Sequence, residues 1–238
     1  MSIRGFYNNL PFNTGEDTNK NNIPWLSLQK QLEQAKTVTE LGCGTGWLCA
    51  RIKNNYPHLK VVGVDISETA ISQACNRTKD VNFFVDNLLE YNKKADIIIS
   101  IGVLHHIETS DIKSLLQRTI DLSKQYCFLG LYHTNSRKAM FDFFEQYPES
   151  KRKDIFKKMM PHMKNAKQRD SWYRDQFYNP YEDSVTLKTL QEVADETKTK
   201  LNYSNLDTDD TYYNVMNKLN TYEFTSGFIY GGYSKCNG

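Results

Sequence analysis

The chain has 238 residues, of which 39% are hydrophobic and 13% aromatic, and its formal net charge is +2. This composition excludes an intrinsically disordered chain, and the near-neutral charge argues against a general attraction to nucleic acid or to anionic membranes. No stretch reaches about 18 apolar residues and the N-terminus lacks the apolar core of a signal peptide, so we expect a soluble, cytoplasmic protein.

Up to residue 132, the sequence alternates between predicted strands and predicted helices. In chain order, periodicity and capping residues predict a helix over 23–36, a strand over 37–41, a helix over 47–56, a strand over 60–66, a helix over 67–77, strands over 81–85 and 95–103, a helix over 110–123 and a strand over 126–132. The fourth strand, ADIIISIGV, is almost entirely apolar, as expected of a strand buried on both faces. This order predicts an α/β fold with a parallel, doubly wound sheet.

The alternation ends after residue 132. Residues 133–184 contain helical segments rich in charges and aromatic rings and no clear strand, so we expect a helical cap, or substrate subdomain, inserted after the fifth strand. A helix is predicted over 186–196, and the segments 200–207 and 222–235 are expected to close the sheet as a hairpin. We expect one domain, 1–238, with 1–36 as an N-terminal segment.

Three glycines occupy five positions of the turn TELGCGTGWLC, between the first strand and its helix. A glycine inside a helix or strand lowers stability by roughly 0.5–1 kcal/mol relative to alanine. Three glycines in one turn, Gly42, Gly44 and Gly46, therefore indicate that a ligand or another part of the chain lies close to the backbone there. A glycine-rich turn between a strand and the start of a helix lets backbone N–H groups point at a bound ligand. Trp47 stands where a dinucleotide fingerprint needs glycine, and the Glu40 carboxylate is unfavourable near phosphates but favourable near an ammonium or sulfonium group.

Together with three later segments, this turn resembles the motifs of class I S-adenosylmethionine (SAM)-dependent methyltransferases. The resemblance rests on ELGCGTGW at 40–47, VVGVDIS at 61–67, FVDNLLEY at 84–91 and DIIISIGVLHHIE at 96–108, in the family's order and spacing. It covers residues 37–132 well. It implies a Rossmann-like sheet of seven strands, mostly parallel with an antiparallel last strand, and a reaction that converts SAM to S-adenosyl-L-homocysteine.

The resemblance also implies roles for individual residues at the carboxyl ends of the strands. The glycines would run against the methionine portion of SAM, with Glu40 near its amino group. Asp65 would accept both ribose hydroxyls and Asp86 the adenine amine; the alternative for both is a capping role. The further implied cofactor contacts are Ile66 along the adenine, the Asn87 backbone, carbonyls from Ser100 to Val103, and Tyr7.

Chemistry beyond the cofactor calls for a proton acceptor at the same edge of the sheet. SAM carries its own electrophile, so only an alcohol or a protonated amine needs a base, and histidine suits that task. We expect His105 or His133 to be this base and His106 to contact the substrate; the alternative is loop histidines that bond to backbone. No metal site is expected, because the five cysteines form no CxxC pair.

The N-terminal segment GFYNNLPFN, at 5–13, is unusually rich in apolar side chains for a leader. In related methyltransferases such a segment folds over the cofactor, so 1–36 is expected to form a lid and a helix. Tyr7 or Phe12 would then stack near the methyl donor. The alternative is a hydrophobic anchor that packs onto the core.

Within the expected cap, RDSWYRDQFYNPYED at 169–183 mixes aromatic and charged residues, as a pocket for a small polar or cationic acceptor would. The expected substrate contacts are Trp172, Tyr173, Arg174, Asp175 and Tyr178. The alternative for Arg174 and Asp175 is an ion pair that holds the cap together. The stretch 151–169 carries eight basic residues against one acid and is either an RNA-binding stripe or a solvated helix face.

The favoured function is a SAM-dependent methyltransferase that acts on a nitrogen or oxygen of a small polar metabolite, with that metabolite as its partner. One alternative is an RNA or protein methyltransferase that uses 151–169 as a platform. It is disfavoured by the near-neutral charge and by SIGVLH in place of an Asn-Pro-Pro-Tyr-type tetrapeptide after the fourth strand. Another is a non-catalytic SAM-binding subunit. Trp47 disfavours an NAD-dependent oxidoreductase.

Overall fold

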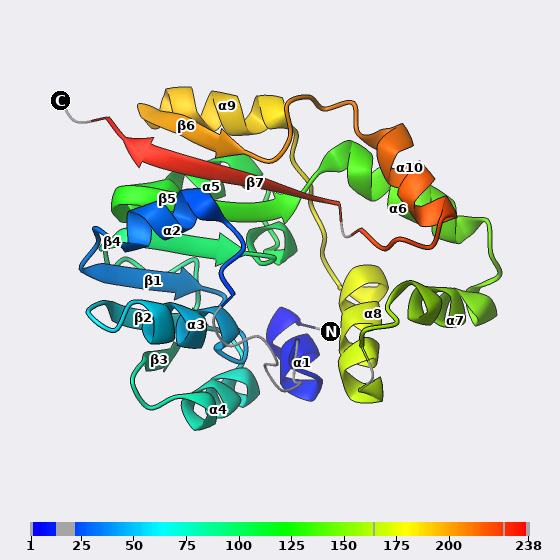
Figure 1. Ribbon diagram of the computed structural model, residues 1–238, viewed down its shortest axis with the longest axis horizontal. Coiled ribbons are helices and arrows are strands. Elements are labelled where there is room, and N and C mark those ends of the chain that lie inside the picture. Colours follow the sequence, from blue (N-terminus) through cyan, green and yellow to red (C-terminus); the bar gives the residue numbers. More distant parts are fainter. Residues whose placement is uncertain (1, 13–21, 164, 226, 237–238) are drawn as a thin grey trace.

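The computed structural model describes residues 2–12, 22–163, 165–225 and 227–236. They form a seven-stranded sheet in the order β3-β2-β1-β4-β5-β7-β6, flanked by helices (Figure 1). The strands are β1 (Thr37–Leu41), β2 (Lys60–Asp65), β3 (Asn82–Val85), β4 (Ala95–Ile101), β5 (Ser123–Tyr132), β6 (Thr199–Ser204) and β7 (Phe228–Lys235). The helices are α1 (Ile3–Asn9), α2 (Leu26–Leu32), α3 (Trp47–Asn55), α4 (Glu68–Arg77), the short 3-10 helix η1 (Leu104–His106), α5 (Ile112–Asp121), α6 (Thr134–Glu145), α7 (Glu149–Met159), α8 (Ala166–Tyr178), α9 (Leu187–Glu196) and α10 (Tyr212–Asn220).

The strand pairing confirms the predicted doubly wound sheet. β1 pairs in parallel with β2 on one side and with β4 on the other, so that Val38 lies opposite both Val61 and Ile97. β7 runs antiparallel to β5 and to β6, which confirms the antiparallel last strand. The strand order reverses between β1 and β4, and open α/β sheets bind ligands at the carboxyl ends of the strands beside such a reversal.

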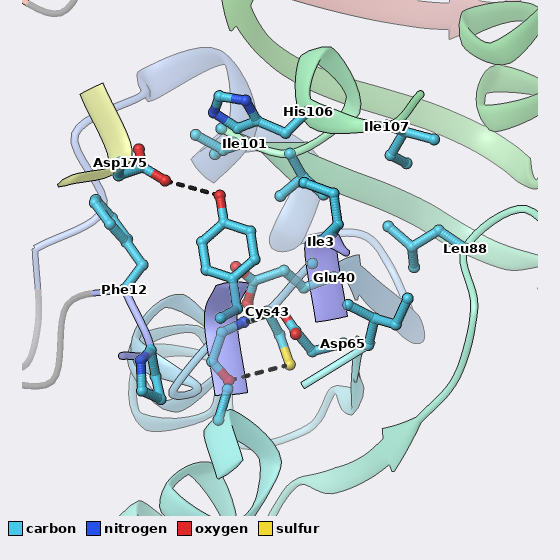
Figure 2. A pocket seen from close by; sticks show the side chains of 18 of the residues that line it. Ile3, Phe12, Glu40, Cys43, Asp65, Leu88, Ile101, His106, Ile107 and Asp175 are labelled. Carbon is cyan, nitrogen blue, oxygen red and sulfur yellow. Dashed lines mark hydrogen bonds between the residues drawn. The ribbon is translucent and has the colours of Figure 1, made fainter. Parts of the chain in front are cut away.

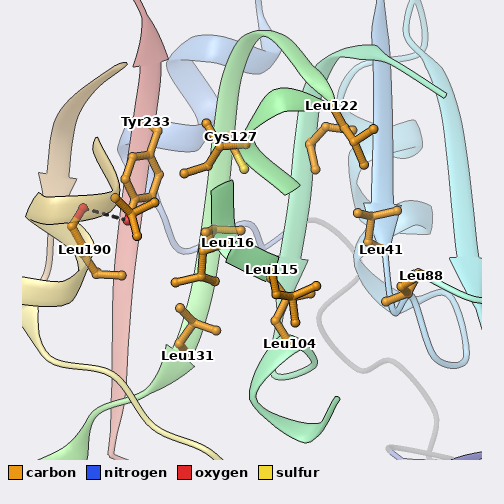
Figure 3. Packing of buried hydrophobic residues seen from close by; sticks show 14 of the residues in the cluster. Leu41, Leu88, Leu104, Leu115, Leu116, Leu122, Cys127, Leu131, Leu190 and Tyr233 are labelled. Carbon is orange, nitrogen blue, oxygen red and sulfur yellow. Dashed lines mark hydrogen bonds between the residues drawn. The ribbon is translucent and has the colours of Figure 1, made fainter. Parts of the chain in front are cut away.

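Helices cover both faces of the sheet. On one face α5 and α9 bring Leu116 and Leu190 into a cluster with Ile98 of β4 (Figure 3). On the other face α2 brings Leu28 into a cluster with Ile97 of β4, together with residues of α3 and α4. Successive side chains of β4 therefore point into two different cores, which explains why this strand is apolar almost throughout.

Two segments differ from the prediction made for them. β6 and β7 pair as expected, but they are not a hairpin, because α10 lies between them in the chain. α10 buries only Val215 and Leu219, four residues apart, and this short apolar stripe gave too weak a periodic signal. At the N-terminus, a helix that was not predicted, α1, begins after Ser2, whose hydroxyl accepts a hydrogen bond from the Gly5 amide.

The stretch expected as a cap, 133–184, contains α6, α7 and α8. Together with α10 these helices enclose a separate apolar cluster, which includes Met140, Phe144, Phe156 and Leu219. They stand beside the carboxyl edge of the sheet, with α8 facing α1 and α7 farther out (Figure 1). α1 and α8 thus lie across from the carboxyl ends of the strands (Figure 1).

Candidate active site

A cavity of about 880 Å³ lies at the carboxyl ends of β1, β2 and β4 (Figure 2). Its volume falls within the range of small-molecule sites, about 300–1,000 Å³. The strand-end side is lined by Glu40, Gly44, Asp65, Ile66, Asn87, Leu88, Ile101, Gly102, Val103 and His106, among others. The opposite side is lined by Tyr7 and Phe12 from the N-terminal segment and by Trp172, Asp175 and Gln176 from α8.

The three glycines of the first turn all have positive φ, but for different reasons. Their φ angles are 76° at Gly42, 51° at Gly44 and 77° at Gly46, a region that other residues rarely adopt. A Cβ on Gly42 would lie 2.2 Å from Val103 Cγ2, and one on Gly46 would lie 2.9 Å from Ala74 Cβ. A Cβ on Gly44 would meet nothing within 4 Å. Gly42 and Gly46 therefore let the turn pack, and only Gly44 leaves room for a ligand against the backbone.

Glu40, near the end of β1, lines the cavity as a buried carboxyl group. Its Oε2 accepts hydrogen bonds from the Cys49 backbone N–H at 3.0 Å and from the Cys49 thiol at 2.9 Å. Burial raises the pKa of Glu40 to about 7, although the bonds from Cys49 oppose this shift. A cationic group bound at this point would favour the ionised carboxylate.

Asp65 is the last residue of β2, and its carboxylate accepts hydrogen bonds from two backbone amides. Oδ2 accepts from the Gly44 N–H at 2.8 Å, and Oδ1 accepts from the Ser67 N–H at 2.9 Å. Burial raises the pKa of Asp65, and these backbone bonds lower it in part. A carboxylate offers about four lone-pair sites, so both oxygens can accept further bonds from a ligand in the cavity.

Three of the predicted cofactor residues do not line the cavity: Gly46, Asp86 and Ser100. The Asp86 carboxylate accepts a hydrogen bond from the Asn87 N–H at 2.8 Å, and Asn87 itself is the residue that lines the cavity. Ser100 is fully buried in β4, where its hydroxyl donates to the Leu41 carbonyl at 3.0 Å. The backbone that follows it, 101–103, lines the cavity.

The first of the two histidines after β4 is enclosed in the protein. His105 is fully buried and does not line the cavity. Its Nδ1 accepts a hydrogen bond from the Tyr132 N–H at 3.2 Å, and its ring stacks on the Tyr132 ring with centroids 3.8 Å apart. Burial, aided by His106 and Arg137, lowers the pKa of His105 well below its usual value, so the ring is neutral.

The second histidine, His106, does line the cavity. Its Nδ1 lies 2.9 Å from the Tyr181 carbonyl oxygen. Because a carbonyl only accepts, Nδ1 carries the proton of this bond, and Nε2 of the neutral ring holds a lone pair. Within the described ranges, Nε2 is buried and has no hydrogen-bond partner.

His133, the third predicted histidine, lies outside the cavity lining. Its Nε2 is 2.8 Å from Asp209 Oδ1, and its Nδ1 is 3.0 Å from the hydroxyls of both Ser136 and Thr211. The histidine and both hydroxyl residues are buried. Serine, histidine and aspartate meet here, but Ser136 and Asp209 do not line the cavity at the strand ends either. The cluster joins the end of β5 to the starts of α6 and α10.

Helix α8 turns one face to the cavity. Trp172, Asp175 and Gln176 stand at the i, i+3, i+4 spacing of one helical face, and all three line it. The Trp172 ring contacts Phe12, with ring centroids 4.8 Å apart, and its indole N–H has no hydrogen-bond partner in the part of the chain that the structure describes.

Three other predicted substrate residues of α8 point elsewhere. Tyr173 is buried in the apolar cluster of the cap. The Arg174 guanidinium lies 3.8 Å from the centroid of the Phe6 ring and donates to the Phe6 carbonyl. Tyr178 is half-exposed and donates to Glu149 at 3.0 Å. The expected pair of Arg174 and Asp175 is therefore divided, with only the carboxylate in the cavity lining.

Tyr7 joins α1 to α8 across the cavity. Its hydroxyl donates to Asp175 Oδ1 at 2.7 Å and accepts from Asn179 Nδ2 at 2.9 Å. Burial and the neighbouring Asp175 raise the pKa of Tyr7 well above its usual value, so the phenol stays protonated. The other Asp175 oxygen accepts from Gln176 Nε2 at 3.3 Å.

Gln176 and Arg137 were missed in the sequence. Arg137 is buried on α6 and donates to both carboxylate oxygens of Glu182, at 2.8 and 2.5 Å. It also donates to Gln176 Oε1 at 3.0 Å, which orients the amide so that Nε2 donates to the Tyr132 hydroxyl at 2.7 Å. The sequence did offer one signal for Arg137: it stands three residues before Met140, on the apolar side of a predicted helical segment, where a buried arginine needs partners.

The family of the chain follows from this geometry and from one sequence comparison. Residues 39–129 match a family described as a methyltransferase domain. They span the glycine turn, Asp65 and His106, and they are part of a seven-stranded sheet whose antiparallel last strand the sequence resemblance implied. Residues 39–129 are thus a methyltransferase domain, with the motifs and fold of the class I SAM-dependent type.

Comparisons with individual proteins find distant relatives of this chain. It is similar to a malonyl-(acyl-carrier protein) O-methyltransferase of Bacillus anthracis, 29% identical over 84 residues, which are 34% of this chain and 30% of that protein. The match thus spans less than a third of the relative. Among solved structures, it resembles magnesium protoporphyrin IX methyltransferase of Synechocystis PCC 6803 with bound SAH, at 13% identity and a TM-score of 0.59, over 98% of each chain. It also resembles PKMT2 of Rickettsia typhi in complex with AdoHcy, at 16% identity and a TM-score of 0.60, over 87% of this chain and 49% of that one. These structural likenesses show the fold.

The family match stops at residue 129 and so leaves out both elements on the acceptor side of the cavity, α1 and α8. The strand-end side of the cavity therefore lies mostly within the matched residues, and the helical side lies outside them. Among the residues described, none of the helices has the length and apolarity that crossing a membrane requires.

Proposed function

We propose that this methyltransferase transfers the methyl group of SAM to a nitrogen or oxygen atom of a small polar acceptor. The observation that carries the proposal is that one cavity is lined both by Gly44 and Asp65 and by His106, whose Nε2 has no hydrogen-bond partner among the described residues. When bound, SAM supplies an electrophilic methyl group. The protein then has to position the acceptor, exclude water and receive a proton.

The strand-end residues fit the donor. The open space at Gly44 admits a ligand against the backbone, and the spare lone pairs of Asp65 suit a pair of ribose hydroxyls. Glu40, buried and lacking a cationic partner among the described residues, suits the ammonium group of the methionine portion. Asn87 and Leu88, after β3, are placed to contact the base.

We assign the proton-accepting role to His106, not to His105 or His133. Its Nδ1–H bond to the Tyr181 carbonyl fixes the tautomer in which Nε2 can accept a proton. His105 lacks access to the cavity, and His133 is held by Asp209 and by two hydroxyls.

The test is methyl transfer from methyl-labelled SAM to three separate pools: small metabolites, RNA and protein. We expect label in the small metabolites. Label in RNA or protein would instead assign the function to a platform such as α7. In that helix Lys151, Lys157 and Lys158 are exposed, and none of them lines the cavity. If SAM binds and no pool is labelled, the protein is a non-catalytic SAM-binding subunit and the proposal fails.

Asp65→Ala tests the donor site separately. Loss of charge-assisted hydrogen bonds of about 1.5–3 kcal/mol predicts SAM binding weaker by about 10- to 100-fold, measured by calorimetry. Asp80→Ala, at an exposed carboxylate between α4 and β3, is the control and should bind SAM as the parent protein does. Unchanged affinity in Asp65→Ala would contradict the assigned donor site.

A further inference from the structure

The ionisable side chains around the cavity are mostly acidic. Among the described residues that line it, four are carboxylic acids and one is a lysine or arginine. The acids are Glu40, Asp65, Glu108 and Asp175, and the base is Arg51. Glu40 and Asp65 belong to the donor side, which leaves Asp175 as the buried carboxylate on the acceptor side.

Arg51 is not placed to neutralise an acidic acceptor. It is part of α3, at the donor end of the cavity, and its guanidinium lies 5.3 Å from the centroid of the Trp47 ring. It also donates to the Asn22 carbonyl at 3.0 Å. A carboxylate acceptor would therefore meet the negative charge of Asp175 at the acceptor end without an opposing lysine or arginine among the described lining residues.

Asp175 is 7% exposed, and a buried carboxylate needs hydrogen bonds or a counter-charge. Tyr7 donates to one of its oxygens and Gln176 to the other, and the dashed line at Asp175 in Figure 2 marks the bond to Oδ1. Two of its four lone-pair sites are thus used, and the rest can accept from a ligand. The phenol and the amide are neutral, and the guanidinium of the adjacent Arg174, although it interacts electrostatically with Asp175, bonds to the Phe6 carbonyl and not to the carboxylate.

Aromatic rings stand beside this carboxylate. Phe12 and Trp172 contact each other and line the cavity, and Figure 2 shows Phe12 on the same side as Asp175. A carboxylate together with ring faces is a combination that binds ammonium groups, through charge and through the cation–π interaction. A phenol or alcohol would need neither the charge of Asp175 nor the rings.

We propose that the methyl acceptor is a primary or secondary amine that binds as an ammonium ion to Asp175. This inference rests on the proposed methyl transfer. His106 Nε2 takes one proton from the ammonium, which frees the nitrogen lone pair. The nitrogen then bonds to the methyl carbon of SAM while the sulfur keeps the electron pair of the broken bond. The products are the methylated ammonium and S-adenosyl-L-homocysteine, and His106 passes its proton to solvent.

The experiment supplies methyl-labelled SAM and a matched panel of small molecules, in which each aliphatic or aromatic skeleton is present as an amine, a carboxylic acid and an alcohol. Amine products are retained on a cation exchanger and survive alkali. Methyl esters release labelled methanol in alkali, and methyl ethers are stable but not retained. We expect retained, alkali-stable label. Ester or ether label would overturn the inference while leaving the proposed methyl transfer intact, and no label in any member of the panel would count against both.

Asp175→Asn connects the result to the residue, because it keeps the shape and removes the charge. We expect turnover on the amines to fall about 10- to 100-fold through loss of a charge-assisted bond, with unchanged affinity for S-adenosyl-L-homocysteine. Asp170→Asn, at an exposed carboxylate of the same helix that pairs with Lys153, is the control and should keep the parent rate. Equal turnover of the amines by Asp175→Asn and by Asp170→Asn would refute recognition by Asp175.

Discussion

The two sides of the cavity are built in different ways. On the donor side, backbone conformation fixes the site: three glycines with positive φ shape one turn, and two backbone amides hold Asp65. On the acceptor side, side chains fix it: Tyr7 and Asp175, which are 168 residues apart in the sequence, meet through one hydrogen bond. A backbone-built site needs particular residues at fixed spacing, whereas a side-chain-built site can be assembled from distant positions with no spacing rule.

This difference predicts how each side responds to substitution. A change on the donor side strains the fold or removes a ligand contact that no neighbour can replace. A change on the acceptor side alters which acceptor binds or reacts, because α1 and α8 pack through many side chains of which only a few line the cavity.

The two adjacent histidines give the largest expected contrast. In His106→Asn the amide can still donate to the Tyr181 carbonyl, but it cannot take a proton, so turnover should fall by about 10²- to 10⁴-fold. SAM affinity should not change. In His105→Asn the amide oxygen can still accept from the Tyr132 N–H, and turnover per folded molecule should remain near the parent value.

Initial rates at saturating SAM, with thermal melting as a check on folding, measure this contrast. His105→Asn should melt at a lower temperature, because it loses the stacked contact with Tyr132. Equal losses of turnover in the two variants would show that His106 has no special role as the proton acceptor.

The next largest contrast is between two glycines of the turn: replacing Gly42 should lower the stability of the fold, whereas replacing Gly44 should weaken SAM binding. Gly42→Ala combines a left-handed backbone, about 1–2 kcal/mol, with a Cβ pressed into Val103, about 1–3 kcal/mol of overpacking, so unfolding should become easier by about 2–5 kcal/mol. Gly44→Ala carries only the backbone cost of about 1–2 kcal/mol, but its methyl group enters the cavity. It should therefore lose SAM binding while it remains folded.

Urea unfolding and calorimetry with SAM measure the two effects on the same samples. Gly44→Ala that binds SAM as tightly as the parent would mean that the open space at this residue is not the donor site.

The same division explains what could be predicted from the sequence. The strands from β1 to β5, the sheet class and the ligand-facing turn follow from local patterns, because apolar runs, caps and glycines act over a few residues. The direction of side chains does not follow so directly. The rings of His105 and His106 are in contact, with centroids 4.3 Å apart, yet only His106 lines the cavity, because the His105 ring is stacked on Tyr132 in the interior. Likewise, which face of α8 lines the cavity depends on how the cap helices pack against the sheet. The sequence therefore predicted substrate contacts not only for Trp172 and Asp175 but also for Tyr173, Arg174 and Tyr178, which point elsewhere.

The smallest expected effect concerns Glu40 and pH. Burial raises the pKa of Glu40 from 4.5 to about 7. In the absence of a ligand, the folded protein is therefore more stable when Glu40 is protonated. This contribution to stability is fully present below pH 4.5 and is lost as the pH rises through 7. A bound ammonium group reverses the preference, since it stabilises the carboxylate. The affinity for S-adenosyl-L-homocysteine should therefore increase by about tenfold between pH 6 and pH 8.

Calorimetry across this pH range, with Glu40→Gln as the partner variant, isolates the effect. The Cys49 thiol beside Glu40 does not titrate in this window, because burial raises its pKa well above the usual value. Glu40→Gln keeps an amide oxygen that can accept from Cys49 but has no charge to gain, so its affinity should be lower at pH 8 and nearly independent of pH. A pH dependence of equal slope in both proteins would mean that another group titrates on binding. The ammonium group would then have to be held by main-chain carbonyls at 101–103 and not by Glu40.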